Sequence, residues 1–79
     1  MQNNRHQCLL TQCDPARNRA RFYALSVEPS LFGDAALVRQ WGRIGTHGQM
    51  KIELFETAAA AETALARLAH RKQRRGYRG

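Results

Sequence analysis

The stretch QWGRIGTHGQMKIELF, residues 40–55, decides the fold. In its second half Met50, Ile52 and Leu54 alternate with polar residues, which predicts a strand with one face in a core and the other in water. Residues 42–48 hold three glycines and predict a tight turn in which glycine adopts positive φ. The stretch therefore predicts a hairpin, and a sheet with one wet face is typically antiparallel.

Two further strands are predicted upstream of this hairpin, at residues 6–13 and 21–27. The turn between them, residues 14–18, carries Asp, Pro and Asn, which favour a chain reversal. Alternation along the second strand places Tyr23 on one face and Phe22 on the other. The sequence does not decide whether Phe22 covers a second small apolar cluster or faces a partner.

The hairpin is predicted to begin with a strand at residues 35–41, after a loop at residues 28–34 that carries Pro, Gly and Asp. Past the hairpin, Thr57 is a candidate N-cap for a helix over residues 58–72. We expect one stripe of this helix to pack across the sheet, formed by Ala58, Ala61, Leu65, Leu68 and Ala69.

These elements predict an α+β fold, a small antiparallel sheet of about four strands with one C-terminal helix packed on one face. The 79 residues form a single domain, 1–79, with a loose N-terminus at residues 1–5 and a basic C-terminal end at residues 72–79.

The charge of the chain is strongly unbalanced. Thirteen Lys and Arg residues, of which only Lys51 and Lys72 are lysines, oppose six Asp and Glu, for a formal charge of +7. Arginine suits bidentate contact with phosphate, so the imbalance favours a polyanionic partner over the alternative of a merely basic soluble protein. Six cations gather without any acid near the helix end: Arg67, Arg71, Lys72, Arg74, Arg75 and Arg78. The helix dipole accounts for two or three of them.

Several classes of function are disfavoured. Cys8 and Cys13 fall on opposite faces of one strand, roughly 16 Å apart, so they cannot form a disulfide. The histidines show no metal-ligand spacing with them, and the acids show no catalytic pairing. We therefore expect two free thiols in the cytoplasm, no metal, no cofactor and no enzymatic activity. We also expect neither a signal peptide nor a membrane span, because no apolar run near the N-terminus exceeds a few residues.

Trp41 stands at a strand end beside Gly42, which cannot shield its ring, and two residues before Arg43. One interpretation is that the ring stacks on a base or sugar while Arg43 meets the adjoining phosphate. The other is a tryptophan at the rim of the core with a surface arginine. Arg39 shares the strand face of Trp41 under either interpretation, whereas Gln40 lies opposite.

The stretch WGRIGTHGQ resembles the signature of the WGR domain, which is named for its Trp-Gly-Arg tripeptide and is best known from DNA-dependent poly(ADP-ribose) polymerases. The similarity extends to the aromatic pair Phe22 and Tyr23, to the F-x-T entry into an Ala-rich helix at residues 55–57, and to the basic helix end at Gly76 and Tyr77. Order and spacing agree over roughly residues 8–77.

The resemblance implies binding to DNA at strand breaks, with Trp41 against a terminal sugar and Arg43 as its polar partner. The chain departs from the polymerases at Ala20, where they carry asparagine, and Asn18 is offset from that position by two. We also expect no catalytic domain for it to signal to, so the chain looks like a stand-alone bacterial member.

We therefore expect a module that binds DNA without sequence specificity, at strand ends in particular, and not a membrane. The alternative is an adaptor that docks an acidic protein partner through the Arg43 surface. The candidate nucleic-acid-binding residues are Trp41, Arg43, Arg39, Lys51, Arg71, Lys72, Arg74, Arg75 and Tyr77.

Overall fold

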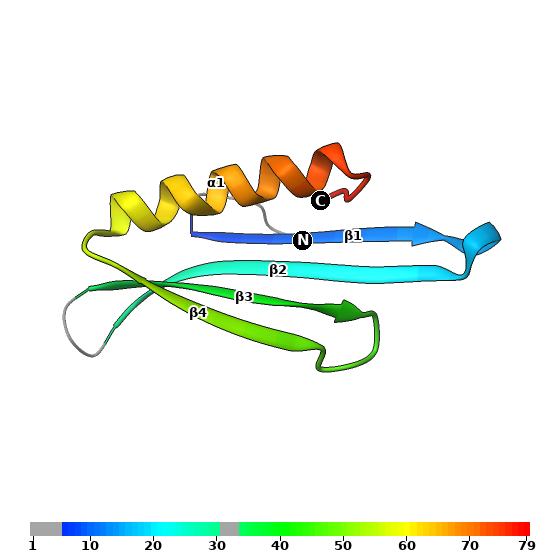
Figure 1. Ribbon diagram of the computed structural model, residues 1–79, viewed down its shortest axis with the longest axis horizontal. Coiled ribbons are helices and arrows are strands. Elements are labelled where there is room, and N and C mark those ends of the chain that lie inside the picture. Colours follow the sequence, from blue (N-terminus) through cyan, green and yellow to red (C-terminus); the bar gives the residue numbers. More distant parts are fainter. Residues whose placement is uncertain (1–5, 31–33) are drawn as a thin grey trace.

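A single antiparallel sheet with one helix across it makes up the protein (Figure 1). The computed structural model describes residues 6–30 and 34–79. The elements run in the order β1 (Gln7–Asp14), η1 (Pro15–Arg17), β2 (Arg19–Pro29), β3 (Ala35–Arg43), β4 (Gln49–Phe55) and α1 (Ala58–Arg74). The strands lie side by side in sequence order, all antiparallel. The predicted α+β class is thus confirmed, while the predicted loose N-terminus falls outside the described residues.

The glycine-rich turn joins β3 to β4 as predicted, although β3 continues two residues further than expected. Gly42 and Arg43 still pair with β2, opposite Phe22 and Arg21. Glycine is needed because the two arms of the turn approach closely. Gly48 has a φ of 67°, and a Cβ atom there would collide with the carbonyl oxygen of Trp41. A Cβ atom at Gly42 would lie 2.7 Å from the Cα of Gly48.

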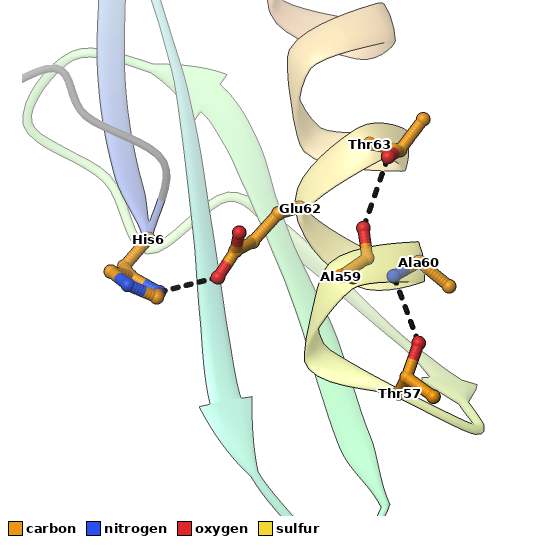
Figure 2. Close-up of polar contacts among 6 residues, drawn as sticks. All are labelled: His6, Thr57, Ala59, Ala60, Glu62 and Thr63. Carbon is orange, nitrogen blue, oxygen red and sulfur yellow. Dashed lines mark hydrogen bonds and ion pairs between the residues drawn. The ribbon is translucent and has the colours of Figure 1, made fainter.

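The start of α1 is fixed by short-range polar contacts (Figure 2). The side chain of Thr57 accepts a hydrogen bond from the Ala60 amide at 3.1 Å, which confirms the predicted N-cap. Across from the helix, His6 Nδ1 lies 3.2 Å from a carboxylate oxygen of Glu62. This contact holds the segment before β1 against the first turns of α1.

The core lies between α1 and the sheet face that it covers. Leu10 and Leu37 are fully buried, and Leu65 from the helix meets them with 3% of its surface exposed. Ala61 is also fully buried, so the helix backbone can approach the strands closely. Of the predicted helical stripe, Ala58 is the exception. It is the first residue of the helix and is exposed.

The prediction that Met50, Ile52 and Leu54 form the core face of β4 is wrong. These side chains are 59%, 59% and 60% exposed. The register explains the reversal: Phe55 pairs with Ala35 and Glu53 pairs with the buried Leu37, so the odd-numbered residues of β4 face the helix. The even-numbered residues lie on the other face of the sheet, which no described element covers (Figure 1).

The basic C-terminal segment is fixed to the edge of β1. The backbone amide of Arg78 donates to the Thr11 carbonyl at 2.7 Å, and the Thr11 amide donates to the Arg78 carbonyl at 2.8 Å. The side chain of Gln12 adds a hydrogen bond to the Arg75 carbonyl at 2.9 Å. The end of α1 and the residues that follow it are therefore held in place.

Candidate functional site

A row of three aromatic rings lies beneath the C-terminal end of α1. The Trp41 and Tyr23 ring centroids are 5.9 Å apart, and Tyr23 meets Tyr77 edge-on at 6.2 Å. These are favourable separations for aromatic pairs. Trp41 comes from β3, Tyr23 from β2 and Tyr77 from the segment after the helix, so the row joins three parts of the chain. Trp41 is half-buried and packs against the core, as the rim interpretation requires.

Lys72, from the last turn of α1, lies over this aromatic row. Its Nζ atom is 4.6 Å from the centre of the Tyr23 ring and 5.9 Å from that of Tyr77. Burial lowers the pKa of Lys72 below its ordinary value, and the charges of Arg75, Arg71 and Arg39 lower it further. The ammonium group is thus held where several like charges meet, and an anion placed there would relieve the repulsion.

Cations dominate the exposed side of the helix end. A shallow hollow of about 500 Å³ has a lining composed of Arg67, His70, Arg71, Arg74 and Arg75. No acidic residue of the described chain lines it. The hollow is therefore suited to a polyanion rather than to a neutral ligand.

A second groove, of about 360 Å³, runs between α1 and β4. Arg67 and Arg71 line it from the helix, and Arg39 and Glu53 line it from the strands. Arg39 Nη2 lies 3.1 Å from a Glu53 carboxylate oxygen, whereas Arg39 Nε is buried without a hydrogen-bond partner. Glu53 thus already neutralises part of the charge of Arg39, although the guanidinium keeps an unsatisfied donor.

Like charges face each other across the strands on either side of Trp41. Arg43 is opposite Arg21, and Arg39 is opposite Lys51, all on the sheet face that α1 occupies. Like charges placed directly opposite destabilise a sheet. Two such pairs lie next to one aromatic row and lower the stability of the sheet there. Local destabilisation of this kind is expected at functional sites.

Arg43 lies beyond the end of the helix, near the turn that joins β1 to β2. Its Nη1 and Nη2 atoms are 3.4 Å and 3.5 Å from the carbonyl and side-chain oxygens of Asn18. These distances are at the long limit for a hydrogen bond, and the side chain is exposed. Asn18 itself adopts the left-handed conformation, with a φ of 53°, that ends the turn.

The structure places all the predicted site residues on or next to the helix side of the sheet. Lys72 and Tyr77 join Trp41 around the aromatic row, and Arg39 joins Arg71 in the groove. Arg74 and Arg75 line the hollow, and Lys51 lies opposite Arg39. Arg43 is set apart from the helix end, at the far end of β3.

Three residues that belong to this surface were not predicted as site residues: Arg21, Tyr23 and Arg67. For the first two, alternation along β2 was a usable signal, because it puts Arg21 and Tyr23 on one face. Only the register shows that they lie opposite Arg43 and Trp41. Arg67 was part of the predicted basic cluster, one helical turn before Arg71.

Two negative observations accompany this surface. Within residues 6–30 and 34–79, no group of three or more His, Cys, Asp or Glu side chains could hold a metal ion. The one helix of the described chain is neither long nor apolar enough to cross a membrane. Cys8 and Cys13 are both free, the first buried and the second exposed, as expected for opposite faces of β1.

Comparison with known proteins identifies the family of this chain. The model of the WGR domain matches residues 6–79. The chain is 47% identical over 73 residues to the uncharacterized protein y4dW of Sinorhizobium fredii (strain NBRC 101917 / NGR234), a match that covers 92% of this chain and 36% of that protein.

The fold also resembles a solved structure. A crystal structure of a protein from Bacteroides fragilis aligns with a TM-score of 0.75 at 24% identity, over 90% of this chain and 18% of that one. Such a likeness shows the fold alone. The chain spans only about a third and about a fifth of the lengths of these two proteins. Because the family match runs from the residue before β1 to the last residue, this chain belongs to the WGR domain family.

Proposed function

We propose that this domain binds nucleic acid, DNA in particular, without sequence specificity and through the helix side of its sheet. The observation that carries the proposal is the meeting of cations from β2, β3, β4 and α1 around the aromatic row of Trp41, Tyr23 and Tyr77. WGR domains of the poly(ADP-ribose) polymerase type often bind nucleic acid, which agrees with this surface.

The cations divide into two groups by position. Arg71, Lys72, Arg74 and Arg75 at the helix end contact the phosphates of one strand, with Arg67 beside them. Arg39, Lys51 and Arg43 on the strands contact the backbone at positions on either side of Trp41. Phosphate contacts of this kind position the nucleic acid and carry no sequence information.

Trp41 provides the preference for strand ends. Within a duplex each base is covered on both faces by its neighbours, whereas a terminal base or sugar leaves one face free. A half-buried ring at the margin of the helix can stack only on such a free face. Tyr23 packs against the Trp41 ring and Tyr77 packs against Tyr23, so the two tyrosines support the ring and have a smaller direct role.

The test is a titration of the domain with a short blunt-ended duplex and with a closed DNA circle of matched composition, monitored by the Trp41 indole NMR signal. We expect the indole to shift with the duplex alone, and the backbone amides at the helix end to shift with both. If neither DNA moves either set of signals, the proposal is wrong.

Variants separate the two parts of the surface. Trp41→Ala removes one stacking contact and should cost about 1–3 kcal/mol of affinity for ends. Changing Arg71, Arg74 and Arg75 to Gln should lower the affinity for both DNAs and flatten its salt dependence by about 0.9 log units per lost phosphate contact. Arg17→Gln is the matched control, because Arg17 lies in η1 beside Asp14 and away from the helix end.

A second candidate function rests on the long contacts of Arg43 to Asn18. They leave the guanidinium available to a carboxylate, so an acidic protein could dock there. The salt dependence distinguishes the two partners. Six or more phosphate contacts imply a loss of about 10³-fold or more in affinity between 50 and 200 mM salt, through counterion release. A much smaller loss favours the acidic protein.

In either case the domain acts by binding rather than by catalysis. A cytoplasmic site of action is part of the proposal, since both thiols are free and nucleic acid is present there.

A further inference from the structure

The sheet face opposite α1 is apolar and carries almost no charge. Its large exposed side chains are Leu9 on β1 and Met50, Ile52 and Leu54 on β4, between 36% and 60% exposed. Among the strand residues of this open face, the register leaves Glu28 as the one charged side chain of the described strands. Arg78 adds one cation at the rim, opposite Thr11 on the outer edge of β1.

The amount of exposed aliphatic surface is unusual for so small a domain. Among residues 6–30 and 34–79 the buried leucines are Leu10, Leu25, Leu37 and Leu65, so about as many large aliphatic side chains of the described chain lie on the open face as in the core. Contiguous apolar patches of this kind mark interaction sites in soluble proteins. The proposed nucleic-acid surface is on the other face, so the open face is not explained by it.

The relief of the open face is uneven. Small side chains, Ala24 and Ser26, occupy the middle of β2 and form the floor of a hollow of about 360 Å³ that Leu9 and Val38 flank. The aliphatic side chains of β4 project beside this hollow. One half of the face is therefore recessed and the other half raised. A twofold axis that lies in the plane of the face and parallel to the strands would place each raised half against the recessed half of a second copy.

We infer that two copies of this chain pack open face to open face, with Ile52 and Leu54 of each copy over the β2 hollow of the other. The four strands, 7 to 11 residues long, offer roughly 440–700 Å² per copy at about 4.8 Å between strands and 3.3 Å per residue. Two copies then bury roughly 900–1,400 Å², which reaches the lower range of specific interfaces, about 1,000–1,200 Å².

The distribution of charge permits a second copy even though each copy carries +7. Stacked sheets lie about 10 Å apart, and each helix lies about 10 Å beyond its sheet, so the two cationic helix ends are roughly 30 Å apart. The Debye length at physiological salt is about 8 Å, so their repulsion is screened. The dimer would present its two cationic surfaces on opposite sides.

Sedimentation equilibrium of the full chain, without nucleic acid and under reducing conditions, tests the inference. Reducing conditions matter because Cys13 is an exposed thiol on the same face. We expect the mass to rise from 9.0 kDa toward twice that value as concentration increases from about 1 µM to 1 mM, the range of a weak interface. A single species of 9.0 kDa throughout would overturn the inference.

The double variant Ile52→Thr, Leu54→Thr places a β-branched residue of high strand propensity at both positions and removes the raised aliphatic surface. We expect it to associate at least about tenfold more weakly, because the loss of even one buried methyl contact per copy weakens association by about that factor. Ala66→Gln, on the exposed side of α1, is the matched control and should associate like the unchanged chain. Association of the double variant at the original strength would contradict the inference.

NMR at low and high concentration identifies the surface that associates. The methyl signals of Leu9, Ile52 and Leu54 should shift with concentration. If instead the β4 amides gain protection from exchange while these methyls stay fixed, the copies pair edge to edge through β4, and the face-to-face arrangement is wrong. Co-purification with a different protein in place of dimer formation would also overturn it.

Discussion

The ammonium group of Lys72 lies 4.6 Å from the centre of the Tyr23 ring, where the end of α1 crosses β2. Burial lowers the pKa of the same group, and the nearby charges of Arg75, Arg71 and Arg39 lower it further. The attraction of the ring and the repulsion of the arginines act on one atom. The attraction favours the charged form of Lys72, whereas burial and the repulsion lower its pKa.

Replacing Lys72 with methionine should weaken DNA binding while leaving the fold as stable as before or more so. Burial and the neighbouring arginines lower the pKa of Lys72, so the charged form is disfavoured in the free domain and its removal relieves that cost. We expect the slope of log affinity against log salt to fall in magnitude by about 0.9. Thermal melting and DNA titration of the same sample measure both effects, and a large drop in melting temperature would contradict this account.

The pKa of Lys72 should rise when DNA binds, because phosphate favours the charged form. In the free domain the folded pKa lies below the ordinary value of 10.5, so the native state releases this proton first and its stability increases with pH between those two values. An NMR titration of the Lys72 Nζ signal, with and without duplex, measures the change. An unchanged pKa on saturation with DNA would place the phosphates elsewhere.

Cys8 has the opposite effect on stability at alkaline pH. Burial raises the pKa of its thiol above the ordinary value of 9.0. The unfolded chain therefore ionises first, so the stabilisation is complete below pH 9.0 and is lost as pH rises through the folded pKa. Cys8→Ala should remove this decline from urea unfolding curves recorded between pH 8 and 10.5. Cys13→Ala is the control, since that thiol is exposed.

Gly48→Ala should disrupt the turn next to Trp41. The added Cβ atom would meet the Trp41 carbonyl oxygen, at a φ of 67° that side chains rarely adopt. We expect a cost above the roughly 1 kcal/mol of an ordinary glycine replacement, together with a shifted indole signal. Gly45→Ala is the matched control, because its φ is also positive while a Cβ there meets nothing within 4 Å. Equal losses from the two variants would show that backbone conformation alone matters.

Alternation and turn chemistry were enough to predict the strands, the hairpin and the helix with its Thr57 cap. They predict which residues share a face, but not which face the helix covers. In β4 the aliphatic residues suggested the core, whereas the register with β3 places Glu53 and Phe55 there instead. A single helix covers only one side of a sheet, and hydrophobicity alone cannot say which side.

The sequence predicts individual residues of the candidate site, but not the contacts between residues on different strands. The Trp-Gly-Arg signature and the basic helix end are local in sequence, so both were found. Tyr23 was missed as the partner of Trp41, because their contact depends on the pairing of β2 with β3. The ion pair of Arg39 with Glu53 likewise arises only from the reversed face of β4.

The pair of backbone hydrogen bonds between Thr11 and Arg78 joins β1 to the segment that follows α1. During synthesis this rung cannot form until residue 78 has left the ribosome, long after β1 and β2 are available. Tyr77, one residue before it, completes the aromatic row under Lys72. The aromatic row is therefore completed last among these elements, and a chain that has not reached Tyr77 lacks it.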